Sequence, residues 1–208
     1  MEDAIPEVGF RELTIDSFVE RLGSAEPAPG GGSASAIAAA LGASLVAMVA
    51  GLSSGRALAA RFLALADEDA AAYAAFAGVL KRPRETEEQK AARTEAIHAA
   101  ARVAADVPMR TVEACLQLVR AAEALAGRSN RNASSDLTVA SLLGEAAARG
   151  AAANVIVNLP SVGDERYADE LRARVMDLLD EIASLAARTR EVVMSGVERQ
   201  PLPSHTWR

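Results

Sequence analysis

Two long runs of small apolar residues constrain the fold of this chain more than any other feature. One extends from Ser33 to Leu52 and the other from Asp136 to Val157, and both consist largely of Ala, Gly, Leu, Val and Ile. Hydrophobic residues make up 50% of the 208 residues, whereas aromatic residues make up only 3%. Because a core without large rings is typical of closely packed helices, both runs are predicted to be buried central helices.

The first run also passes the length threshold of roughly 18 residues for a membrane span. It contains Ser35 and Ser44, is dominated by Ala and Gly, and lacks flanking aromatic anchors. We therefore interpret it as a core helix and expect no membrane partner.

Helical periodicity continues through the rest of the chain, and no segment has the alternation typical of a strand. Thr86 and Gln89 form a capping box, and Pro108 indicates a kink or a restart. The predicted helices cover residues 14–22, 33–52, 56–80, 86–106, 108–125, 136–157 and 164–197. The prediction is an all-α bundle of six to seven helices in a single domain over 1–198, with a poorly ordered tail over 199–208.

Charge and cysteine content narrow the possible partners. A net charge of -6 and a pI near 5.1 disfavour nucleic acid and anionic membranes, which need a concentrated positive surface. Cys115 is the single cysteine and lies among apolar neighbours, so it is predicted to be a buried structural residue. No signal peptide opens the chain, and we expect a cytoplasmic protein. His98 and His205 are the only histidines, so no catalytic metal site is predicted.

A proline- and glycine-rich segment directly precedes the first apolar run. Three consecutive glycines permit backbone angles closed to other residues, and a helix that starts after them offers free N–H groups to an anion or a carbonyl. A flexible connector is the alternative, but the prolines favour a rigid cradle. The candidate binding residues are Pro29, Gly30, Gly31, Gly32 and Ser33.

A second polar segment precedes the other apolar run and comprises Asn130, Asn132, Ser135 and Asp136. An N-cap formed by Ser135 or Asp136 explains only one or two of these residues. Asn154 and Asn158 then recur at i,i+4 near the end of the same helix, where amides need polar partners. A heterocycle edge and an internal hydrogen bond remain alternative partners for them.

Charged residues within the helices provide further candidates. Asp67, Glu68 and Asp69 lie in the middle of the helix predicted over 56–80, where at least two are expected to face solvent and one to point inward. Glu145 and Arg149 are spaced for an i,i+4 ion pair.

Several ordered motifs together resemble the formiminotransferase-cyclodeaminase C-terminal family over residues 14–197. They are PAPGGGSASA at 27–36, VP at 107–108, NRNASSD at 130–136 and NVIVN at 154–158. The resemblance implies an all-helical homodimer that acts on one-carbon tetrahydrofolates in a cleft near the dimer interface. We expect hydrolysis of 5,10-methenyltetrahydrofolate to 10-formyltetrahydrofolate, with the folate as substrate and no separate cofactor. The alternatives are formiminotetrahydrofolate cyclodeaminase, which releases ammonia, and a non-catalytic folate-binding protein. A chain without the transferase half favours the cyclohydrolase.

The resemblance also suggests roles for the candidate residues. Hydrolysis of the methenyl group needs a positioned water and a proton transfer, but no covalent nucleophile. Asp136 is expected to take the proton or to pair with the cationic ring, and Asp69 is the reserve candidate. The Gly30–Ser33 amides would meet a carbonyl or carboxylate. The pterin edge or an oxygen of the intermediate would be held by Asn130, Asn132, Asn154 and Asn158, and Ser135 is a further candidate for substrate binding. The candidates for binding the glutamate tail are Arg128, Arg131 and Arg149.

The chain departs from the family pattern between Gly51 and Leu58, where relatives carry a longer stretch with basic and tyrosine residues. A true deletion would put binding of the substrate tail in doubt, whereas an omitted loop would be a flexible one.

Overall fold

The computed structural model describes residues 9–51 and 53–201, which contain six α-helices, three short 3-10 turns and no strand. The α-helices are α1 (Ile15–Leu22), α2 (Gly31–Ala50), α3 (Ser53–Leu80), α4 (Glu87–Leu125), α5 (Ser134–Asn158) and α6 (Glu165–Ser195). The 3-10 turns are Phe10–Glu12, Arg131–Ala133 and Leu159–Ser161. The predicted all-α bundle is confirmed.

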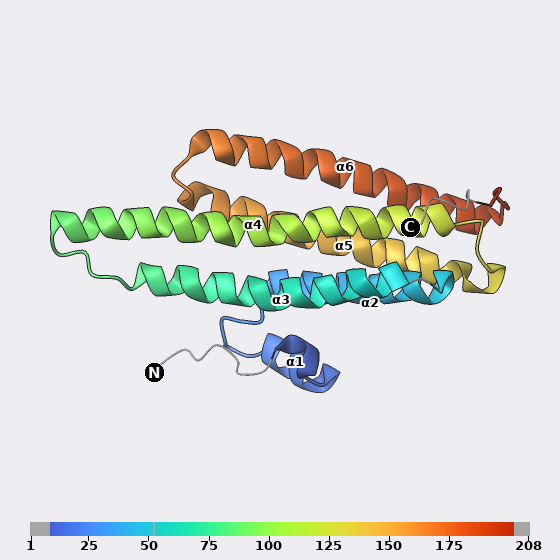
Figure 1. Ribbon diagram of the computed structural model, residues 1–208, viewed down its shortest axis with the longest axis horizontal. Helices are drawn as coiled ribbons and strands as arrows, with labels where there is room; N and C mark the ends of the chain where they lie inside the picture. Colours follow the sequence, from blue (N-terminus) through green and yellow to red (C-terminus); the bar gives the residue numbers. More distant parts are fainter. Residues whose placement is uncertain (1–8, 52, 202–208) are drawn as a thin grey trace.

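Four long helices form two packed layers, and the fifth long helix, α6, lies beside them (Figure 1). α3 and α4 make a long hairpin that lies in front of α2 and α5, while α6 packs against α4 and α5. The short helix α1 lies outside the bundle, below α3. The turn between α3 and α4 extends beyond the start of α6, so this end of the hairpin is an arm of two helices.

Glycines let the Ala-rich helices approach their neighbours closely. A Cβ atom on Gly144 of α5 would lie 2.7 Å from Val119 Cγ2 on α4, which is closer than real Cβ contacts. A Cβ atom on Gly42 of α2 would lie 3.1 Å from the Ala140 carbonyl oxygen on α5. The prediction that α2 and α5 are central is confirmed, but their burial is one-sided because both helices also expose large apolar side chains.

Helix α4 is continuous through Pro108, so the alternative of a restart at this proline is wrong. The predicted capping box is confirmed, since Thr86 Oγ1 accepts a hydrogen bond from the Gln89 N–H and the Gln89 side chain accepts from the Thr86 N–H. Cys115 is fully buried in α4 as predicted, and this burial raises the pKa of its thiol to about 12.

Three predicted helix starts differ from the structure, and one of them is α3, which begins at Ser53 rather than Arg56. Helix α2 begins at Gly31 rather than Ser33, so two of the three glycines belong to its first turn and not to a connector. Helix α5 begins at Ser134 with Ala133 in the capping position, so neither Ser135 nor Asp136 is its N-cap. The 3-10 turn Arg131–Ala133 runs directly into α5, so helical backbone is already present before Asp136.

The connection between α2 and α3 is very short. Gly51 ends α2 with a φ of 63°, which favours glycine, and α3 begins at Ser53. Of the predicted tail, residues 202–208 lie outside the described residues, whereas the Arg199 N–H donates to the Gly127 carbonyl oxygen at 2.8 Å. By length and composition α2 could cross a membrane, but its contacts with α3, α4 and α5 make it a helix of the bundle.

Candidate active site

A cleft of about 180 Å³ lies where the N-terminus of α2 meets α3, α4 and the C-terminal end of α5. Its lining combines a carboxylate, two amides, a glycine-rich backbone and two aromatic rings. The lining residues are Pro27, Ala28, Gly30, Gly31, Gly32, Ser33, Asp69, Ala70, Ala72, Tyr73, Phe76, Ala104, Asn154 and Asn158. The structure therefore brings together three groups of candidates that are far apart in the sequence.

Asp69 is the only carboxylate among the residues that line this cleft. Ser33, which is fully buried, donates from its Oγ to Asp69 Oδ2 at 3.3 Å and to the Ala66 carbonyl oxygen at 3.2 Å. Burial raises the pKa of Asp69 above its ordinary value, and hydrogen bonds from the Ser33 hydroxyl and backbone N–H oppose part of the rise. Asp69 is thus a desolvated carboxyl group whose position is fixed by the start of α2.

The glycine segment is shaped by this carboxyl group. A Cβ atom on Gly32 would lie 2.2 Å from Asp69 Oδ1, so no side chain fits at this position. The predicted contact of the segment's amides with a ligand stays a prediction, and the Ser33 backbone N–H lowers the pKa of Asp69. Pro29 is buried and does not line the cleft, and the Ala28–Pro29 peptide bond is cis.

Asn154 and Asn158 enter the cleft from the last turns of α5. Asn154 Nδ2 donates to the Gly150 carbonyl oxygen at 2.9 Å. Asn158 Nδ2 donates to the Ala104 carbonyl oxygen on α4 and to the Asn154 carbonyl oxygen, both at 2.9 Å. Internal hydrogen bonds therefore use one hydrogen of the Asn154 amide nitrogen and both hydrogens of the Asn158 amide nitrogen, while the Asn158 Oδ1 accepts no hydrogen bond from the residues that the structure describes.

Two aromatic side chains of the cleft were not predicted from the sequence. Tyr73 and Phe76 follow Asp69 on α3 by four and seven residues, which is the spacing of one helix face. Aromatic residues are rare in this chain, and the side chain of Tyr73 is 47% exposed. Their i+4 and i+7 spacing from Asp69 is the sequence pattern that could have predicted them. In the structure their rings form a flat apolar wall of the cleft.

The other acidic residues of α3 have structural partners. Asp67 Oδ1 accepts a hydrogen bond from the Phe10 N–H at 2.8 Å, and Glu68 forms an ion pair with Arg110 on α4. Asp69 is an inward-pointing residue as predicted, but Asp67 is also half-buried, so the expectation that at least two of the three face solvent is wrong and only Glu68 is exposed.

The second polar segment lies at the opposite end of α5 and does not reach the cleft of its own chain. Asp136 and Asn154 are 18 residues apart on one helix, which corresponds to about 27 Å at 1.5 Å per residue. Asn130 Oδ1 accepts from the Asn132 N–H at 3.0 Å, so these asparagines shape the turn before α5. Within one chain Asp136, Asn130, Asn132 and Ser135 are therefore separate from Gly30 and Asn154.

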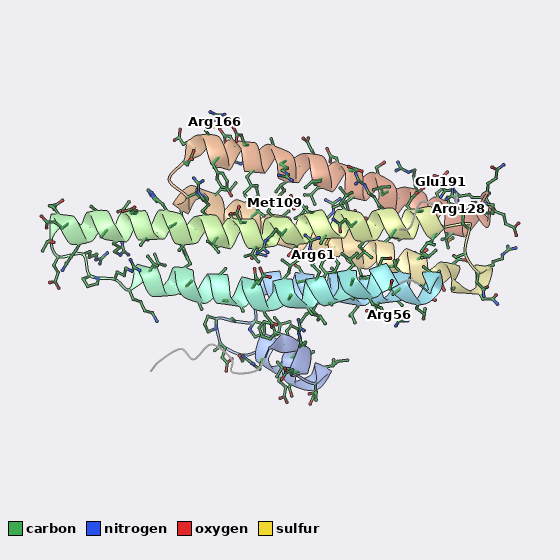
Figure 2. All side chains as sticks on the ribbon, in the orientation of Figure 1. Arg56, Arg61, Met109, Arg128, Arg166 and Glu191 are labelled. Carbon is green, nitrogen blue, oxygen red and sulfur yellow. The ribbon has the colours of Figure 1, made fainter. Side chains whose placement is uncertain are left out.

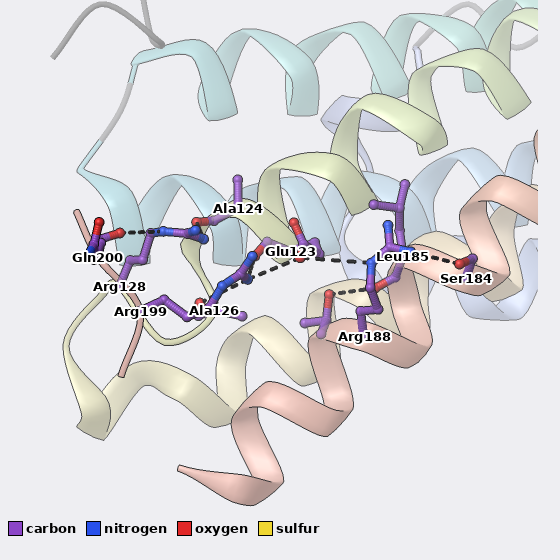
Figure 3. Close-up of polar contacts among 10 residues, drawn as sticks. Glu123, Ala124, Ala126, Arg128, Ser184, Leu185, Arg188, Arg199 and Gln200 are labelled. Atoms are coloured by element: carbon purple, nitrogen blue, oxygen red, sulfur yellow. Dashed lines mark hydrogen bonds and ion pairs between the residues drawn. The ribbon is translucent and has the colours of Figure 1, made fainter. Parts of the chain in front are cut away.

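A larger cavity of about 600 Å³ lies near this second segment, and Arg128, Arg131 and Arg199 contribute to its lining. Figure 2 shows Arg128 at the end of the bundle where α4 and α6 finish. Arg128 Nε donates to the Gln200 carbonyl oxygen at 2.7 Å, and Arg199 pairs with Glu123 at 3.0 Å (Figure 3). Arg128 and Arg199 thus hold residues 199–200 against α4.

The remaining candidates have simple roles. Arg149 lines neither cavity and forms the predicted i,i+4 ion pair with Glu145 at 3.0 Å. Among the described residues, no three His, Cys, Asp or Glu side chains lie close enough together to hold a metal ion.

Comparison with known proteins agrees with the order of the motifs. The family model described as formiminotransferase-cyclodeaminase matches residues 14–62 and 52–177. This chain belongs to the formiminotransferase-cyclodeaminase family. The two matched segments overlap at 52–62.

Relatives in this family carry two different names. A methenyltetrahydrofolate cyclohydrolase of Methylorubrum extorquens is 35% identical over 202 residues, which cover 88% of this chain and 97% of that protein. A formimidoyltransferase-cyclodeaminase of Rattus norvegicus is also 35% identical, but this chain matches only 38% of its length. The crystal structure of formiminotetrahydrofolate cyclodeaminase from Thermotoga maritima has a TM-score of 0.80 over 89% of this chain and 98% of its own, at 21% identity. That similarity establishes the fold alone.

Proposed function

We propose that this protein hydrolyses 5,10-methenyltetrahydrofolate to 10-formyltetrahydrofolate. The observation that carries the proposal is a desolvated carboxyl group, Asp69, which Ser33 holds in a cleft with amide and aromatic walls. The similarity to a methenyltetrahydrofolate cyclohydrolase over 97% of that protein's length supports the same activity.

Hydrolysis of the methenyl group needs a base and polar groups that orient the substrate. Water adds to the electrophilic methenyl carbon while one water proton passes to Asp69 Oδ1 or Oδ2. The bond from this carbon to N5 then breaks as N5 takes up the proton held by Asp69 and the new hydroxyl group on the carbon releases its proton to solvent, which leaves the formyl group on N10. Because a raised pKa makes the ionised carboxylate a stronger base, the burial of Asp69 favours the first step.

The walls of the cleft would orient the substrate. The rings of Tyr73 and Phe76 offer a surface for stacking a flat heterocycle. The amide of Asn158 offers an acceptor oxygen for an N–H group at the ligand's edge. This geometry supports Asp69 rather than Asp136 as the base in the cleft of a single chain.

We propose further that the protein is a homodimer in which α5 packs against α5 of a second copy. The cleft of one chain, about 180 Å³, is smaller than the roughly 300 to 1,000 Å³ of a typical ligand pocket. Leu41 and Met48 on α2 and Val139 and Leu142 on α5 are between 45% and 60% exposed, which is typical of an interface. A second copy of the same apolar surface can cover them.

The spacing along α5 makes this interface self-complementary. Exposed residues recur on one side of the helix at positions 135, 139, 142, 146, 149, 153 and 156. The midpoint between Asp136 and Asn154 is residue 145, beside the small exposed Ala146. A two-fold axis there would run the two α5 helices antiparallel and place Asp136 of one copy near Asn154 of the other. Asp136 would then pair with the cationic substrate from across the interface.

Formiminotetrahydrofolate cyclodeaminase is the second candidate, because the Rattus norvegicus relative named formimidoyltransferase-cyclodeaminase is equally identical. The test supplies each substrate separately to the purified protein. Loss of methenyl absorbance supports the cyclohydrolase, and release of ammonia from the formimino substrate supports the cyclodeaminase. Binding of tetrahydrofolate without either signal would support a non-catalytic folate-binding protein and reject the proposal.

The proposed reaction takes the folate as substrate and needs no separate cofactor or metal ion. We propose that the protein is cytoplasmic. Its net charge of -6 argues against nucleic acid as a partner.

A further inference from the structure

Pro108 and Asn158 are linked through one backbone carbonyl group. In a regular α-helix the N–H of residue 108 would donate to the carbonyl oxygen of residue 104, but proline has no N–H. Its ring also pushes that carbonyl group away from the helix axis. Helix α4 nevertheless continues through Pro108, which is buried. The carbonyl group of Ala104 is thereby left without its regular partner inside α4.

Asn158 supplies the missing donor from the neighbouring helix. Its Nδ2 lies 2.9 Å from the Ala104 carbonyl oxygen and 2.9 Å from the Asn154 carbonyl oxygen. An amide nitrogen has two hydrogens, and both are now used. Because both partners are acceptors, they also determine which of the two amide atoms faces them. The Oδ1 must therefore point away from Ala104 and Asn154.

Both Ala104 and Asn158 line the cleft, so this orientation has a chemical consequence. With its nitrogen engaged, Asn158 can offer a ligand an acceptor but not a donor. An amide that was free to rotate could offer either group. The hydrogen bond to Ala104 thus fixes the orientation of the Asn158 amide, so that only its oxygen is available to a ligand.

We propose that Pro108 is a positioning residue that reserves the Ala104 carbonyl group for Asn158, so that the cleft selects a ligand with an N–H donor at this point. The ligand class is a heterocycle with an amide, amidine or amino N–H at its edge. This inference rests on the proposed function because it deepens the description of the same cleft. The proposed interaction connects two sequence motifs, at 107–108 and 154–158.

The first test restores the missing donor. In P108A the new N–H can bind the Ala104 carbonyl group along the helix, which turns this group away from Asn158. We expect the Kd for tetrahydrofolate and the KM for the methenyl substrate to rise about tenfold, equivalent to about 1.4 kcal/mol, with kcat changed less than about threefold. V107A is the matched control, because it removes the same number of carbon atoms from a buried neighbour and adds no N–H. V107A should lower Tm and leave Kd unchanged.

A double-mutant cycle separates positioning from general damage. If Pro108 acts through Asn158, P108A adds no more than about twofold to the Kd of N158A. Additive effects of the two substitutions would overturn the proposal. If P108A does not fold, N158D provides the answer, since it keeps the acceptor oxygens and loses the donor. A Kd for N158D close to the wild-type value would show that the anchor is dispensable.

A ligand-free measurement distinguishes failure of this inference from failure of the proposed function. The side-chain amide signals of Asn158 are identified in an NMR spectrum by their loss in N158A. We expect slow hydrogen exchange of this amide in the wild type and in V107A, and fast exchange in P108A. Slow exchange in P108A would overturn the anchor. If the anchor is present but tetrahydrofolate does not bind, the function proposed for the cleft is wrong.

Discussion

The two ends of helix α5 contain similar polar residues but have very different surroundings. Asn154 and Asn158 lie in a cleft built from four helices, where Asp69 is desolvated and its pKa is raised. Asp136 lies about 27 Å away in the first turn of the same helix and makes no hydrogen bond or ion pair with the described residues. The comparison teaches that the packing around a carboxyl group, more than its neighbours in sequence, decides its chemistry.

The largest expected effect comes from replacing Asp69 and Asp136 by asparagine, each in a separate variant. D69N should lower kcat by about 10² to 10⁴, the usual contribution of a general base, and keep the helical circular dichroism spectrum. D136N should raise KM and lower kcat by no more than about tenfold, because it removes only a charge that faces the substrate. Steady-state kinetics with the methenyl substrate measure both. A larger loss of kcat in D136N than in D69N would instead identify Asp136, at the other end of α5, as the base.

The proposed interface predicts the next largest effect. L142E places two carboxylates near the two-fold axis of a homodimer, so we expect a monomer at micromolar concentration and at least tenfold lower kcat/KM. M176E is the matched control, since Met176 is 52% exposed on α6 and Leu142 is 46% exposed on α5. Sedimentation velocity compares the two variants. An L142E protein that keeps the wild-type mass and activity would contradict an α5–α5 interface.

A smaller effect is expected from G32A, which tests how closely the glycine segment fits Asp69. The added Cβ would lie 2.2 Å from Asp69 Oδ1, so the carboxylate must move. We expect kcat to fall about tenfold and stability to fall by about 1–3 kcal/mol. G78A is the control on α3, where no atom lies within 4 Å of the new Cβ, and it should gain up to about 1 kcal/mol. Urea unfolding curves and kinetics measure both, and equal behaviour of the two variants would refute the close fit.

The smallest effect concerns the pH dependence of stability. A raised pKa in the folded state means that the contribution of Asp69 is fully present below its ordinary value of 3.8 and is lost as the pH rises through the folded-state pKa. D69N lacks this titration, so its Tm at pH 7 should exceed that of the wild type by on the order of a few degrees. The difference should shrink as the pH approaches 4. Parallel Tm curves for the two proteins would show that Asp69 is not desolvated.

Much of the cleft could be predicted from the sequence because its residues lie in local patterns. The glycines before an apolar helix, the i,i+4 pair Asn154 and Asn158, and one inward acidic residue on α3 were all expected. Tyr73 and Phe76 were missed because an aromatic residue on a helix is usually part of the core. The roles of Asp136, Asn130, Asn132 and Ser135 stay predictions, since their chain does not bring them to this cleft.

The sequence by itself determined the helical class, most helix boundaries and the family, because periodicity, capping residues and ordered motifs act over a few turns of chain. Only the tertiary structure decided which polar residues share a cleft and which do not. The physical reason is that a helix carries its two ends about 27 Å apart over 18 residues, while packing brings α2, α3, α4 and α5 together at one of those ends. Tertiary packing also decided that the carbonyl group left free by Pro108 meets Asn158, a contact between residues 54 positions apart.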